Sequence, residues 1–135
     1  MTADRHAVVI RAASVAPFDR GRGLRTLHMT RSEIGAEELL TGITEFDPGA
    51  EVPPHLHNCE EAVVILEGLA RFEADGVSHD LEVGDSTYAP AGVVHRFVNR
   101  GAGRMRIFWA YGSVDATRTV VTSGKTFRIG REDPA

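Results

Sequence analysis

Residues 49–68 read GAEVPPHLHNCEEAVVILEG, and the rest of the chain is organised around this stretch. It contains two histidines one residue apart, His55 and His57, and a glutamate four residues further on, Glu61. In an extended chain, side chains two positions apart point to the same side, so both imidazoles can face one space. Two imidazoles and a carboxylate presented to one point suit a divalent transition metal. The stretch therefore predicts a metal site.

Short strand-like segments separated by turn residues continue on both sides of this stretch. Asp75-Gly76, between two such segments, is a strong signal for a two-residue hairpin. In the run RMRIFWAY, residues 104–111, apolar side chains fall on one face and arginines on the other. This alternation predicts that Trp109 and Tyr111 point inward. Many short strands with almost no helical period predict an all-β fold, either an antiparallel barrel or a double-sheet jelly roll.

The ends of the chain carry further strand-like pieces. Ala7 to Ile10 is expected to form a short strand, and residues 113–135 a C-terminal hairpin or tail. Two strand-like pieces, 117–122 and 126–129, lie within that tail. The chain has 135 residues, and domains typically run to about 100–150, so we expect residues 1–135 to form a single domain.

Composition excludes several classes of protein. A hydrophobic fraction of 42% and a charged fraction of 25% are those of an ordinary soluble globular protein. The net charge of −4 argues against a nucleic-acid partner, and the apolar runs are too short for a transmembrane helix. The N-terminal residues lack the long apolar core of a signal peptide. A single cysteine, Cys59, excludes an internal disulfide and fits a reducing compartment, so we expect a cytoplasmic protein.

Two spaced motifs make the sequence resemble the cupins, a family of small β-barrels. The first motif is a glycine, five residues, His-x-His, three or four residues, Glu, six residues and a glycine. It spans 49–68 and is filled by Gly49, His55, His57, Glu61 and Gly68. The second motif is a glycine, five residues, Pro-x-Gly, two residues, His, three residues and Asn. It spans 84–99 and is filled by Gly84, Pro90, Gly92, His95 and Asn99.

This resemblance implies a single-domain cupin with a double-stranded β-helix, or jelly-roll, fold. It adds His95 to His55, His57 and Glu61 as a fourth metal ligand. Three imidazoles and one carboxylate would leave two positions open on a six-coordinate ion. The donor set does not choose among Fe, Mn, Zn, Ni and Co. The resemblance also implies a homodimer, with spare strand edges at 7–10 and 117–129.

The resemblance leaves the reaction open, because cupins serve many functions. The leading hypothesis is a metal-dependent enzyme acting on a small organic molecule. It would be either a dioxygenase or an isomerase or cyclase that works through Lewis-acid chemistry. The alternative is a non-enzymatic, metal-anchored small-molecule binding or sensor protein. A metal-stabilised structural barrel, as in storage cupins, is the third reading, and the short single-domain length fits it poorly.

Several residues near the motifs are candidates for the pocket wall. Phe97, Trp109 and Tyr111 are expected to serve as core or as pocket wall, and Cys59 as a buried thiol or a pocket residue. Glu60 has the opposite strand parity to Glu61 and is expected on the exposed face. Two arginines beside the second motif, Arg96 and Arg100, could bind an acidic substrate or lie on the surface. Asn99 is expected to hydrogen-bond a turn.

Overall fold

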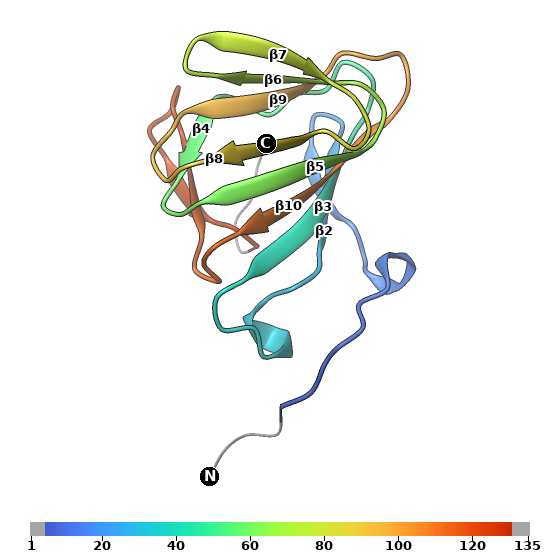
Figure 1. Ribbon diagram of the computed structural model, residues 1–135, viewed down its shortest axis with the longest axis vertical. Helices are drawn as coiled ribbons and strands as arrows, with labels where there is room; N and C mark the ends of the chain where they lie inside the picture. The colour runs from blue at the N-terminus through green and yellow to red at the C-terminus, as the bar shows by residue number, and fades with distance from the viewer. Residues whose placement is uncertain (1–4, 131–135) are drawn as a thin grey trace.

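The computed structural model describes residues 5–130 as two antiparallel β-sheets packed face to face (Figure 1). The first sheet contains, in spatial order, β1 (Phe18–Gly21), β2 (Leu24–His28), β3 (Leu40–Phe46), β10 (Met105–Tyr111), β5 (Glu61–Glu67) and β8 (Ser86–Ala89). The second contains β12 (Thr126–Arg128), β11 (Thr117–Val120), β4 (His55–His57), β9 (His95–Asn99), β6 (Ala70–Ala74) and β7 (Val77–Leu81). Two short 3-10 turns are η1 (Ala12–Ser14) and η2 (Ser32–Ile34). The expected all-β jelly-roll fold is confirmed.

The core lies between the two sheets and follows the alternation of the sequence. In β10, every second side chain from Met105 to Tyr111 is buried, and the residues between them are half-buried. Trp109 therefore points inward, as predicted. Phe46 contributes to this core from the first sheet, and Phe72 from the second. Because apolar burial is the main favourable term in folding, this shared core holds the sheets together.

Two turns show why glycine is needed at their positions. Asp75 and Gly76 join β6 to β7 with φ angles of 54° and 73°, the doubly left-handed turn that suits a two-residue hairpin. Gly68, between β5 and β6, has a φ of 82°, and an added Cβ would collide with the main-chain carbonyl oxygen of Arg104. The chain can therefore pass directly from β5 in the first sheet to β6 in the second only if this residue is glycine.

The two ends of the chain differ from expectation in different ways. The prediction of a strand at 7–10 is wrong: these residues form no strand, and the side chains of Val8 and Val9 are exposed. A C-terminal hairpin does form within 113–135, as β11 and β12. Its strand β11 is no free edge, because it pairs with β4, the strand that carries two of the histidines, whereas β12 is the outermost strand of the second sheet. No helix among residues 5–130 is long and apolar enough to cross a membrane.

Candidate metal centre

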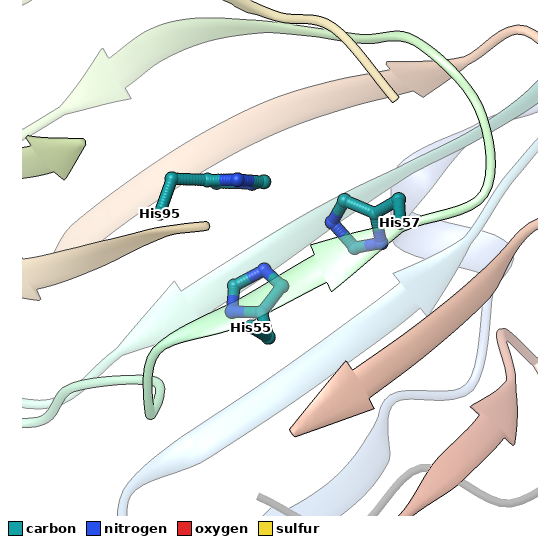
Figure 2. Close-up of side chains that lie close together, drawn as sticks. All are labelled: His55, His57 and His95. Atoms are coloured by element: carbon teal, nitrogen blue, oxygen red, sulfur yellow. The ribbon is translucent and has the colours of Figure 1, made fainter. Parts of the chain in front are cut away.

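Three histidine side chains meet in the second sheet. β4 is only three residues long, and its alternation buries His55 and His57 while Leu56 between them is half-buried. β9 runs beside it, and His55 is paired in register with His95. Residues paired across neighbouring strands share a face of the sheet, so the third imidazole joins the first two. Figure 2 shows the three rings turned toward one another.

Each imidazole is oriented by a main-chain carbonyl group. The Nδ1 atoms of His55, His57 and His95 lie 2.8, 3.0 and 2.9 Å from the carbonyl oxygens of Pro53, Thr117 and Val93. A carbonyl oxygen only accepts hydrogen bonds, so each Nδ1 carries the proton and donates it. When such a ring is neutral, its Nε2 atom is the one that holds a free lone pair for a metal. Orienting contacts of this kind are typical of metal-binding histidines.

Glu61 reaches the same point from the other sheet. It is the first residue of β5, pairs with Tyr111 of β10, and is buried. One carboxylate oxygen, Oε1, lies 2.9 Å from Nε2 of His95 and 3.8 Å from Nε2 of His57. Its neighbour Glu60 is exposed, as the strand parity indicated. The chain changes sheets between His57 and Glu61, so the group of four side chains exists only in the folded barrel.

The electrostatics favour a cation among these groups. Burial, reinforced by the neighbouring histidines, lowers the pKa of His55 well below its ordinary value, so this ring is neutral. Burial also lowers the pKa of His57, although the charge of Glu61 opposes it. Burial is the largest single influence on the pKa of both His95 and Glu61 and disfavours their ionisation, but their mutual hydrogen bond, the attraction between their charges and smaller contacts together outweigh it. The pKa of His95 is therefore raised and that of Glu61 is lowered. A positive charge is thus stabilised where Glu61 faces His95.

The donor set fits a transition metal. One ligand atom from each histidine lies within 4.8 Å of the other two, and all three side chains are buried. Metal–nitrogen bonds of about 2.0–2.1 Å place two nitrogens about 3–4 Å apart, so small side-chain movements would bring all three nitrogens within bonding distance of one ion. Imidazole nitrogens together with a carboxylate oxygen are borderline ligands and suit Zn, Fe, Mn, Co or Ni. These three histidines could hold a divalent ion, with Glu61 beside them.

A cavity of about 40 Å³ adjoins this centre inside the barrel. Its wall includes His55 and Glu61, and the predicted wall residues Phe97, Trp109 and Tyr111 all line it. The wall also includes the apolar side chains of Phe46, Val52, Ile107 and Ile129. A mostly apolar wall with a few polar groups is typical of a small-molecule site.

Cys59 does not line this cavity. Its side chain is half-buried and packs against the hydrophobic core. Burial raises the pKa of its thiol, which favours the unreactive protonated form. The structure therefore places Cys59 with the core and not with the cavity.

The arginines beside the second motif lie away from the cavity, which is the surface alternative of the two that the sequence left open. Arg96 donates hydrogen bonds to Glu73 and Glu51, and Arg100 donates to the carbonyl oxygens of Ala70 and Leu81. Neither arginine lines the cavity. Arg118 does, and sequence reasoning missed it. The alternation of the strand could have indicated that Arg118 is buried, because residue 118 shares a face with two buried apolar residues, Ala116 and Val120.

Comparisons with known proteins agree with this architecture. A family model described as "Cupin domain" matches residues 42–111. Dimethylsulfoniopropionate lyase DddW from Ruegeria pomeroyi is 34% identical over 93 residues, 69% of this chain and 59% of that protein. Polyketide synthase CurC from Streptomyces cyaneus is 33% identical over 89 residues, 65% of this chain and 57% of that protein. The chain thus spans somewhat less than two-thirds of the length of these relatives.

Solved structures share the fold. The polyketide cyclase RemF from Streptomyces resistomycificus superposes with a TM-score of 0.74 at 18% identity, covering 96% of this chain and 90% of that one. The family model covers more than half of the chain, and it includes the strands that carry the three histidines and Glu61. The chain belongs to the cupin family.

Proposed function

We propose that this protein is a metal-dependent enzyme that acts on a small organic molecule through Lewis-acid chemistry. The observation that carries the proposal is the convergence of three oriented Nε2 atoms and one buried carboxylate beside a cavity. The proposed ligands of a divalent ion are His55, His57, His95 and Glu61. Such an ion supplies a Lewis acid that polarises a carbonyl or carboxylate oxygen of the substrate.

The residues around this centre support proton transfer in a dry site. The hydroxyl oxygen of Tyr111 lies 3.4 Å from Nε2 of His57, and its hydrogen bond helps to lower the pKa of Glu61. This hydroxyl is placed to give a proton to a substrate atom at the centre, or to take one from it. Phe97 and Trp109 exclude water from the cavity wall, which strengthens electrostatic interactions inside.

The names of one sequence relative and one structural neighbour favour Lewis-acid chemistry over oxygenation. The names of DddW and RemF describe a lyase and a polyketide cyclase. Eliminations and cyclisations of this kind need a polarised substrate and a proton acceptor, and neither needs an oxidant. The hydroxyl group of Tyr111, which lies beside the proposed metal ligand His57, suits both reactions.

The test is metal-dependent proton exchange. Protein purified without air, and loaded with one divalent metal at a time, is incubated in D₂O with small keto acids. We expect loss of the α-proton signal in NMR spectra with loaded protein only, and no oxygen uptake. Tyr111→Phe should retain the metal and lose at least about 90% of the exchange rate, since general acid–base groups contribute about 10²–10⁴-fold. Metal-dependent oxygen uptake would instead identify a dioxygenase. Ligand-induced stabilisation without any turnover would identify a sensor or binding protein.

We also propose a homodimer, formed through the outer face of the first sheet. Val64 and Leu66 of β5 and Tyr88 of β8 are exposed large side chains on that face, with exposed fractions of 36%, 39% and 60%. A second copy would cover this apolar surface. Light scattering at micromolar concentration should give twice the chain mass. Val64→Glu should give a monomer, whereas Val77→Glu, at an exposed valine of the second sheet, should remain dimeric. A wild-type monomer would contradict the proposal.

A further inference from the structure

Two buried hydroxyl groups line the cavity and have no part in the proposed function. Thr26 of β2 and Thr44 of β3 are 1% and 3% exposed, and both belong to the cavity wall. They are paired in register, so their side chains project from the same face of the sheet. The next pair on that face, Leu24 with Phe46, is apolar and fully buried. Valine has nearly the shape of threonine and no polar group, so two hydroxyls at this depth require an explanation.

One of the two hydroxyls is explained by the tryptophan of β10. Nε1 of Trp109 donates a hydrogen bond of 2.9 Å to Oγ1 of Thr44. The indole ring packs closely on Gly42, where an added Cβ would collide with it, and this close packing fixes the ring beside β3. Thr44 alone therefore satisfies the buried indole N–H group. Thr26 is not needed for it.

The pair holds one hydrogen more than the described residues accept. Oγ1 of Thr26 lies 3.3 Å from Oγ1 of Thr44, whereas hydroxyl groups that bond each other are typically about 2.7–2.8 Å apart. Two hydroxyls carry two hydrogens, and only one of these can lie between the two oxygens. Within residues 5–130, the two oxygens make no other hydrogen bond than this one and that from Trp109. The second hydrogen therefore requires an acceptor that enters the cavity.

The bond from Trp109 gives these groups a direction. A hydroxyl oxygen that accepts a hydrogen bond becomes a stronger donor, because successive hydrogen bonds polarise one another. Thr44 accepts from the indole and is thus the better donor of the pair, with Thr26 as its acceptor. We call this series, from Trp109 through Thr44 to Thr26, the hydroxyl relay. It ends on the hydroxyl hydrogen of Thr26.

We propose that Thr26, at the end of the hydroxyl relay, donates a hydrogen bond to an oxygen atom of the substrate. His55 and Glu61 line the same cavity, so the metal centre and the relay share one space. β10 separates β3 from β5, the strand of Glu61, which places these two strands about 10 Å apart. The substrate is therefore an elongated small molecule with an oxygen function at each end. This inference rests on the proposed function, which assigns the other oxygen to the metal.

The test asks whether Thr26 distinguishes an oxygen from a methyl group. The full chain is loaded with Zn²⁺ and titrated with alkyl hydroxamates, which chelate zinc through two oxygens and carry tails of increasing length. Each tail is used in two forms of equal length, one ending in a hydroxyl group and one in a methyl group. At the length that reaches Thr26, calorimetry should show about three- to tenfold tighter binding of the hydroxyl form, which is what one net hydrogen bond contributes.

Three variants assign this preference to the hydroxyl group. Thr26→Val should abolish the preference, and Thr26→Ser, which restores the hydroxyl, should retain it. Thr41→Val is the matched control and should behave as the wild type does. Thr41 is a buried threonine of the same strand as Thr44, and its hydroxyl accepts a hydrogen bond from the main-chain N–H of Thr30. It does not line the cavity.

The indole N–H group of Trp109 gives a second readout, because it begins the relay and belongs to the only tryptophan of the chain. In proton–nitrogen NMR spectra of the wild type, the preferred hydroxyl probe should move this resonance further than its methyl counterpart does. In Thr26→Val the two probes should move it equally. Equal shifts in the wild type as well would show that the relay does not reach the ligand.

Zinc uptake separates this inference from the proposed function. A wild-type protein that takes up zinc and binds both forms of every tail equally overturns the inference and leaves the metal centre intact. That result would mean that Thr26 meets only water, and it needs no variant to fold. A preference that survives in Thr26→Val also overturns the inference. A wild-type protein that takes up no zinc overturns both proposals.

Discussion

His95→Ala is expected to abolish stoichiometric metal binding. The substitution removes one of three oriented nitrogens, and it leaves the buried Glu61 carboxylate without its partner at 2.9 Å. Losing even an outer contact of a metal site typically costs about 10–100-fold in affinity, so losing a ligand should cost at least about 100-fold. Elemental analysis should give about one divalent ion per chain for the wild type and less than about 0.1 for the variant.

The matched control for this variant is His79→Ala. His79 lies in β7 of the same sheet, is exposed, and is not part of the histidine group. Its replacement should leave the metal content unchanged. A His95→Ala protein that still binds one ion per chain with wild-type affinity would show that the ion is held elsewhere.

Asn99→Leu should lower the stability of the fold clearly, although Asn99 is not one of the proposed metal ligands. Asn99 is 2% exposed, and its amide nitrogen lies 3.1 Å from the carbonyl oxygens of Phe46 and Asp47 and 2.9 Å from that of Gly103. Its amide oxygen accepts a hydrogen bond from the main-chain N–H of Gly101. Leucine has a similar size and leaves these groups unsatisfied, each at a cost of about 1–3 kcal/mol.

We expect the free energy of unfolding of Asn99→Leu to fall by about 2–4 kcal/mol, since water will satisfy some of these groups. Urea denaturation followed by Trp109 fluorescence measures it. Asn58→Leu is the control, because Asn58 also makes two hydrogen bonds to the main chain but is exposed. It should lose less than about 1 kcal/mol. Equal losses in the two variants would contradict a structural role for Asn99 in joining these loops.

Much of the barrel could be predicted because its signals are local. The alternation in β10 and the two-residue turn at Asp75-Gly76 appear within a few residues of sequence. Asn99 also behaves as expected, since its side chain holds the turns at 46–47 and 101–103. Local propensity and turn chemistry both point to the observed fold at these positions.

The remaining features depend on pairing between distant segments. Ala7 to Ile10 is an apolar run, yet a strand needs a partner, and local sequence does not reveal whether one lies beside it. β1 was missed for the opposite reason, because its four residues are mostly exposed and show no alternation. Arg118 was missed because a charged residue in a strand usually faces solvent. Its burial follows from the pairing of β11 with β4, which lies about 60 residues earlier in the chain.

We propose that one divalent ion binds where the two sheets bring the histidines and Glu61 together. Anomalous X-ray diffraction from crystals of metal-loaded protein, recorded on both sides of the absorption edge of the metal, tests it directly. We expect a single anomalous peak at bonding distance, about 2.0–2.2 Å, from Nε2 of His55, His57 and His95, with Glu61 as the fourth protein ligand. A peak elsewhere in the molecule, or bonding through Nδ1 of these rings, would contradict it.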